Sequence, residues 1–178
     1  QDEVEETIAL NTLGTTIHYV LEDLYKPYVN VYLNAEIIDE MQLQLIELLN
    51  KHFEGVYSEG NIQTGKNYLS YQVAKKNIEN LLKWERNRIV EFNDTVKIIH
   101  FEQALSFTLN DSSLPYEVKI GGKVDRIEIR NNIVRIIDYK TGKVEPNSLL
   151  IKDWDNLLDI ASEKIIQLLT YVLMFSEN

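Results

Sequence analysis

The stretch that decides the fold spans residues 116–143 and reads YEVKIGGKVDRIEIRNNIVRIIDYKTGK. Two runs rich in β-branched residues flank Asn131–Asn132. Asparagine tolerates the positive φ that both central positions of a two-residue type I′ turn require. The pattern therefore predicts a β-hairpin in which residue 130 faces residue 133, so that the numbers of paired residues sum to 263.

This register sorts the hairpin side chains onto two faces. It is expected to place Asp125 opposite Asp138 and Lys123 opposite Lys140. The other members of that face are apolar: Ile127, Ile129, Val134 and Ile136. The second face has the composition of a solvated surface, although its last two members indicate partial cover: Arg126, Glu128, Arg130, Arg135, Ile137 and Tyr139.

Two opposed carboxylates on an apolar face repel each other, because their Cβ atoms lie about 4.5–5.5 Å apart. A divalent cation such as Mg²⁺ or Mn²⁺ would relieve the repulsion and keep positions for water and a substrate phosphate. Such a cation polarises a phosphate oxygen and lowers the pKa of bound water, and Lys140 is placed to stabilise developing charge. The residues fit a metal site that hydrolyses phosphodiester bonds. They fit equally well an ordinary hairpin whose two strands pair in a shifted register.

The remaining sequence predicts helices before and after a β-rich region. Apolar residues recur at spacings of three and four over 14–28, 36–52 and 67–91, which is typical of amphipathic helices. From residue 95 the pattern changes to three β-rich runs. A last apolar stripe predicts a helix over 157–175. Helices, a hairpin-connected sheet and a closing helix indicate an α/β or α+β domain.

Composition limits the classes of function. The 178 residues contain no Cys, so disulfides and Cys-ligated iron–sulphur clusters are excluded. The absence of a signal peptide pattern makes the cytoplasm the expected location. The net charge of −10 comes from residues 1–60, which carry twelve acidic and two basic residues. Residues 119–143 instead carry seven basic and three acidic residues, which fits a local anion site or a solvated strand face.

Four segments together resemble one family. GGKVDRIEI and IIDYKTGK are similar to the active-site hairpin of the PD-(D/E)xK nuclease superfamily, specifically its RecB/AddB-type domain with G-x-x-D-R and D-Y-K-T-G segments. LGTTIHYVLEDLY resembles the family's His-bearing N-terminal helix, and QLLTY resembles its C-terminal Q-x-x-x-Y helix. The four segments occur in the family's order from His18 to Tyr171.

The resemblance implies an α/β fold with a restriction-endonuclease-like core, in which helices flank a central mixed β-sheet. Residues 1–178 would form a single nuclease domain, a fragment of a larger helicase–nuclease protein. Its parts would be a His-bearing helix at 14–28, a helical insertion at 29–94, a β-meander with the active-site hairpin at 95–140 and the closing helix at 157–175.

The resemblance also implies roles for individual residues. The metal ligands would be His18, Asp125, Asp138 and the backbone carbonyl of Tyr139. Asp125, Asp138 and Lys140 would be catalytic. The substrate-binding residues would be Gln167, Tyr171 and Thr141.

Two residues have alternative interpretations. His18 shares a helical stripe with Leu21 and Tyr25, so on its own it fits a buried core histidine as well as a ligand. Glu102 falls where related domains often have a supporting acidic residue, but an exposed strand carboxylate fits equally well.

The function implied is a Mg²⁺- or Mn²⁺-dependent DNA exonuclease that acts in DNA end processing and recombinational repair. Its partners would be DNA and the helicase domain or subunit of an ATP-dependent helicase–nuclease, with no membrane and no iron–sulphur cluster. One alternative is a catalytically silent nuclease fold with a structural or DNA-holding role. Another is a scaffold that presents the helices at 36–52 and 67–91 to a protein partner.

Overall fold

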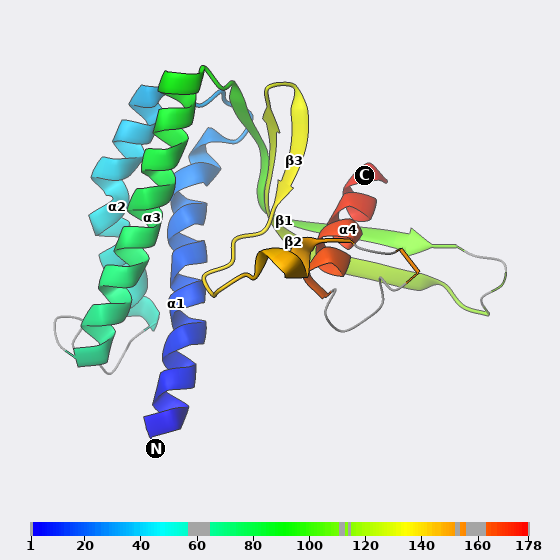
Figure 1. Ribbon diagram of the computed structural model, residues 1–178, viewed down its shortest axis with the longest axis horizontal. Helices are drawn as coiled ribbons and strands as arrows, with labels where there is room; N and C mark the ends of the chain where they lie inside the picture. Colours follow the sequence, from blue (N-terminus) through cyan, green and yellow to red (C-terminus); the bar gives the residue numbers. More distant parts are fainter. Residues whose placement is uncertain are drawn as a thin grey trace.

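The computed structural model describes residues 2–56, 65–110, 113, 115–151, 154–155 and 163–177. Its elements follow in the order α1 (Asp2–Tyr25), η1 (Lys26–Tyr28), α2 (Ala35–Val56), α3 (Gly65–Phe92), β1 (Val96–Leu109), β2 (Val118–Arg130), β3 (Ile133–Ile137), η2 (Pro146–Leu149) and α4 (Glu163–Ser176). Figure 1 shows α1, α2 and α3 gathered as one layer beside the strands, with α4 against the strands away from that layer. The chain therefore forms an α/β fold in which helices flank the sheet.

The three long helices pack together because each carries a row of apolar side chains. In α2 the buried row recurs at spacings of three and four: Ile38, Met41, Leu45, Leu49 and Phe53. These side chains share one hydrophobic core with residues of α1, α3 and β1. Helices occur where the periodicity predicts them, but α1 starts well before residue 14 and gives way to the η1 turn at Lys26. Pro27 explains this end, because proline cannot continue an α-helix.

The described strands form an antiparallel sheet in the order β1-β2-β3. The mixed sheet expected from the resemblance is therefore wrong for the part of the chain that the structure describes. Short connections between consecutive strands produce antiparallel pairs, whereas a parallel pair needs a crossover connection. A register shift between Ile98 and His100 marks a β-bulge in β1.

The predicted hairpin is confirmed at its turn and along β3. Asn131 and Asn132 have φ of 52° and 65°, as a type I′ turn requires. Every pair from Arg130↔Ile133 to Arg126↔Ile137 follows the predicted register.

The hairpin ladder is shorter than expected. Because β3 ends at Ile137, Asp125 does not pair with Asp138, and Lys123 does not pair with Lys140. That part of the prediction is wrong. The backbone N–H of Tyr139 instead donates a hydrogen bond of 2.5 Å to Asp125 Oδ2, which takes the place of ladder pairing.

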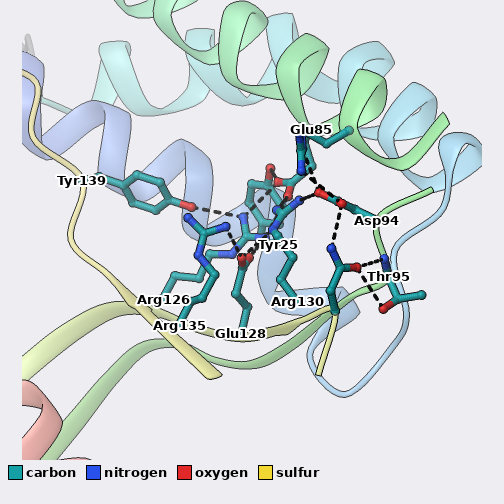
Figure 2. Close-up of polar contacts among 11 residues, drawn as sticks. Tyr25, Glu85, Asp94, Thr95, Arg126, Glu128, Arg130, Arg135 and Tyr139 are labelled. Carbon is teal, nitrogen blue, oxygen red and sulfur yellow. Dashed lines mark hydrogen bonds and ion pairs between the residues drawn. The ribbon is translucent and has the colours of Figure 1, made fainter. Parts of the chain in front are cut away.

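The expectation of a solvated second hairpin face is also wrong. Arg126, Glu128 and Arg130 are 2%, 0% and 5% exposed. Figure 2 shows them beneath the helices, among hydrogen bonds and ion pairs that reach Glu85 of α3. Charges of both signs are buried here because they neutralise one another.

The helix α4 packs against the sheet through a second apolar cluster, which includes Val124, Ile127, Tyr171 and Met174. A Cβ at Gly122 would lie 3.2 Å from Tyr171 Cε1, so glycine permits this close approach. The helix begins at Glu163, and residues 157–162 of the predicted 157–175 helix lie outside the described residues. Within the described part of the chain, no helix has the length and apolar character needed to cross a membrane.

Candidate metal centre

Side chains from α1, β1 and β2 meet between the first helix and the sheet. His18 Nδ1 lies 3.0 Å from Glu102 Oε1 and 3.6 Å from Asp125 Oδ1. One possible ligand atom from each of these residues lies within 4.8 Å of the other two. The folded chain thus brings an imidazole nitrogen and two carboxylates to one point.

Glu102 belongs to this site through its position in the sheet. It lies between Phe101, which pairs with Arg126, and Gln103, which pairs with Val124, so it sits across the ladder from Asp125. Its side chain is 6% exposed. The structure therefore contradicts the alternative of an exposed strand carboxylate.

Lys123 accompanies Glu102 at the rim of the site. Lys123 Nζ lies 2.6 Å from Glu102 Oε2, while the lysine side chain remains about half exposed. Contact with Glu102 raises the pKa of Lys123 above its usual value. Lys123 therefore stays charged and offsets part of the negative charge at the site.

The surroundings of Asp125 disfavour the ionised form of its carboxyl group. Burial of its side chain, together with the nearby carboxylates of Asp138 and Glu102, raises the pKa of Asp125 to about 6. The N–H of Tyr139 acts in the opposite direction by donating to the carboxylate. Clustered carboxylates that are largely buried, as these are, are stabilised by a cation.

A second polar group lies around Asp138, just past the end of β3. Lys140 Nζ lies 2.6 Å from Asp138 Oδ2, and Gln167 Nε2 donates to Asp138 Oδ1 at 3.1 Å. Gln167 Oε1 accepts a hydrogen bond from Lys140 Nζ at 3.2 Å, and its Nε2 also donates to the hydroxyl of Tyr171 at 2.8 Å. One amide of α4 therefore connects Asp138, Lys140 and Tyr171.

The predicted site residues are thus divided between two adjoining groups. His18 and Asp125 lie together with Glu102, whereas Asp138 contacts Lys140 and Gln167 rather than His18. Thr141 is exposed and lines a cavity of about 320 Å³ between the segment 139–141 and the helices α1 and α3. Gln167 and Tyr171 lie four positions apart, a spacing that puts them on one face of α4, and they are joined there by a hydrogen bond.

The donor set fits a hard divalent cation. Carboxylate oxygens are the ligands that Mg²⁺ and Mn²⁺ prefer, and an imidazole nitrogen is acceptable to Mn²⁺. Three carboxylates at the site, those of Glu102, Asp125 and Asp138, outnumber the two lysines that contact them. A divalent cation would reverse this deficit of positive charge.

Comparison with known proteins agrees with this geometry. The sequence model of the PD-(D/E)XK nuclease superfamily matches residues 1–178. The chain belongs to the PD-(D/E)XK nuclease superfamily. Members of this superfamily are generally metal-dependent nucleases, and they typically use Mg²⁺ or Mn²⁺.

Two relatives extend the comparison. An uncharacterized protein of Rickettsia felis and an uncharacterized protein of Rickettsia conorii are each 30% identical to the chain over 145 residues. The match covers 81% of this chain but 16% of each relative. The chain therefore spans about a sixth of the length of these relatives. No solved structure matches the chain.

Sequence reasoning did not assign Lys123 and left Glu102 undecided. The register of β1 against β2 would have shown that Glu102 lies opposite Asp125. The residues between these two strands do not define a turn of fixed length, so the sequence does not fix that register. The sequence of the hairpin alone therefore could not determine which β1 residue faces Asp125.

Proposed function

We propose that the chain is a divalent-metal-dependent DNA nuclease domain that hydrolyses phosphodiester bonds. The observation that carries the proposal is the meeting of His18, Glu102 and Asp125, with the Asp138–Lys140 ion pair next to them, in a chain that belongs to the PD-(D/E)XK superfamily. Titratable groups of both signs at one partly buried point are typical of catalytic sites.

The metal would be held by His18, Asp125, Asp138 and the backbone carbonyl of Tyr139, with Glu102 as a further ligand. Support comes from the short His18–Glu102 contact and from the raised pKa of Asp125. When bound, the metal supplies Lewis-acid activation of a phosphate oxygen and of water. A preference for Mg²⁺ or Mn²⁺ follows from the oxygen-rich donor set.

Lys140 is proposed as the catalytic lysine. Its ammonium group, 2.6 Å from Asp138, would donate a hydrogen bond to a phosphate oxygen or to the attacking water and stabilise the charge that develops there. Gln167 accepts a hydrogen bond from Lys140 and would therefore orient it. Tyr171 and Thr141 are proposed to contact the substrate strand.

We further propose that the chain is an exonuclease of the RecB/AddB type. It would act in DNA end processing and repair beside a helicase domain or subunit. The relatives support a domain within a longer polypeptide, because this chain matches about a sixth of each. The acidic residues in 1–60 fit a module that receives its DNA strand from other parts of such a protein.

Cleavage of labelled oligonucleotides tests this function. The purified chain with Mg²⁺ should shorten single- or double-stranded DNA labelled at either end, and EDTA should abolish the reaction. Lys140→Ala should lower kcat by about a hundredfold or more, because it removes a donor to developing charge. The matched control is Lys143→Ala, which removes a lysine that is 86% exposed and contacts Glu145.

The outcomes separate the two candidate roles. Loss of cleavage in Lys140→Ala but not in Lys143→Ala supports the enzyme. Binding of DNA and Mn²⁺ by the wild-type chain with no cleavage under any condition would contradict it and favour a catalytically silent DNA-holding module.

A further inference from the structure

A cluster of buried charges lies between the sheet and the helices, outside the proposed metal site. Its centre is Glu85 of α3, which is 0% exposed and accepts two hydrogen bonds from Arg126, at 2.9 and 3.0 Å. Arg130 and the hydroxyl of Tyr25 each donate another, at 2.6 Å. Four hydrogen bonds therefore converge on one carboxylate, and the two that Arg126 itself donates fix its guanidinium (Figure 2).

One contact leads from this cluster toward the metal site. Arg126 Nη1 donates a hydrogen bond of 3.2 Å to the hydroxyl of Tyr139. Figure 2 shows the Tyr139 ring reaching from its own segment of chain toward Arg126. The ring is further held by Phe101, with ring centroids 6.1 Å apart.

Two neighbouring residues of β2 form hydrogen bonds with Tyr139. Asp125 accepts a hydrogen bond from the backbone N–H of Tyr139, and Arg126 donates one to its hydroxyl. Successive side chains of a strand point to opposite faces, so the hydrogen bonds with Asp125 and Arg126 reach Tyr139 from opposite faces of the sheet. We call this arrangement the Tyr139 clamp.

The clamp holds a segment that the sheet does not hold. Ladder pairing stops at Arg126↔Ile137, so the backbone of residues 138–140 has no strand partner among the described residues. Asp138 and Lys140, on either side of Tyr139, both contribute to the proposed site. Whatever fixes Tyr139 therefore also determines where its two neighbours lie.

We infer that Tyr139 is a positioning residue whose hydroxyl, held by the Arg126–Glu85 ion pair, fixes Asp138 and Lys140 in the site. This inference rests on the proposed nuclease function for its catalytic consequence. It concerns the side chain of Tyr139, whereas the metal ligand proposed above is the backbone carbonyl of the same residue.

The test compares Tyr139→Phe with Tyr25→Phe. The first variant removes the hydroxyl that Arg126 holds and keeps the ring and the backbone N–H. The second removes a hydroxyl that donates to the same Glu85 but has no contact with residues 138–140 among the described hydrogen bonds. If the buried cluster only stabilises the fold, both variants should change the amide exchange of residue 139 and kcat to a similar extent.

The first readout needs neither metal nor DNA. Hydrogen exchange of the amide of residue 139, followed by NMR in the metal-free protein, reports how often this segment opens. Loss of the hydrogen bond to a charged partner should accelerate this exchange by about tenfold or more in Tyr139→Phe. Tyr25→Phe should leave it within about twofold of the wild type, because the hydrogen bond between Arg126 and Tyr139 remains.

The second readout is cleavage of an oligonucleotide with Mg²⁺. We expect kcat to fall by about tenfold or more in Tyr139→Phe, with KM within about twofold, because misplaced reacting groups affect the chemical step more than binding. Tyr25→Phe should keep the wild-type kcat.

These readouts distinguish the two proposals. Unchanged exchange of amide 139 in Tyr139→Phe, or equal losses of kcat in both variants, would overturn the positioning role. A wild-type chain that neither cleaves DNA nor binds Mn²⁺ would overturn the nuclease function, and the exchange comparison would still support or overturn the clamp.

Discussion

The Nδ1 atom of His18 lies 3.0 Å from Oε1 of Glu102, although 84 positions separate the two residues in the chain. This contact joins the first helix to the first strand at the point where Asp125 enters from the second strand. The position of Glu102 therefore makes it part of the proposed metal site.

Substitution of Glu102 should weaken metal binding. Glu102→Gln removes one of the carboxylates nearest His18, and we expect the affinity for Mn²⁺ to fall by about tenfold or more in a calorimetric titration. Glu79→Gln is the matched control, because Glu79 is a partly exposed carboxylate on α3 that contacts Lys75. Equal affinities in both variants would show that Glu102 is not a ligand.

Gln167 should affect turnover more than metal binding. Its amide connects Asp138, Lys140 and Tyr171, so Gln167→Ala leaves Lys140 with one fewer partner. We expect a kcat lower by about tenfold, with a smaller change in Mn²⁺ affinity. Gln103→Ala removes a glutamine whose amide contacts its neighbour's backbone, and it should change neither quantity. Wild-type turnover in Gln167→Ala would contradict an orienting role.

Glu85 should be a major determinant of stability. Glu85→Gln leaves the buried guanidinium groups of Arg126 and Arg130 without a full counter-charge, and we expect the free energy of unfolding to fall by about 3–5 kcal/mol. Asp39→Asn breaks a similar two-bond contact with Arg86 at the exposed surface and should change stability far less. Urea denaturation measures both, and similar losses would show that burial of the ion pair is unimportant.

Asp94 should make stability depend on acidic pH. Hydrogen bonds from Asn131, Arg88 and Arg130 lower the pKa of Asp94 from 3.8 to about 2. A carboxyl group with a lowered pKa in the folded state stabilises the protein above its unfolded pKa and loses that effect as the pH falls. The free energy of unfolding should therefore decrease between about pH 4 and pH 2, and it should do so less steeply in Asp94→Asn.

Urea denaturation at several pH values checks the prediction for Asp94. Glu91→Gln, a substitution of an exposed carboxylate in the last turn of α3, should keep the wild-type slope. An Asp94→Asn variant with the same slope as the wild type would contradict this account of acid sensitivity.

Local patterns predicted most of the elements. The asparagine pair alone set the register of the hairpin, because few two-residue turns match the twist of the strands. The end of β3 could not be predicted in this way. Asp138 and its neighbours leave the ladder because the carboxylate of Asp125 accepts the N–H of Tyr139, and a hydrogen bond to a side chain has no signature in strand periodicity.

The buried charges were misread for a related reason. Alternating Arg and Glu residues on a strand are typical of a solvated face, and the partner that buries them, Glu85, lies 41 positions before Arg126. A sequence shows the charges but not the helix that covers them. Glu102 remained undecided for the same reason, because its role depends on a long-range strand register.

Calorimetric titration of Mn²⁺ into the metal-free chain tests the central claim most directly. We predict saturable binding by the wild type and an affinity lower by about tenfold or more in Asp125→Asn, which keeps the shape of the side chain but removes its charge. Asp23→Asn, at a His52–Asp23 contact outside the site, should bind Mn²⁺ as the wild type does. Absence of saturable binding by the folded wild type, or equal binding by Asp125→Asn, would contradict a metal centre at His18, Glu102 and Asp125.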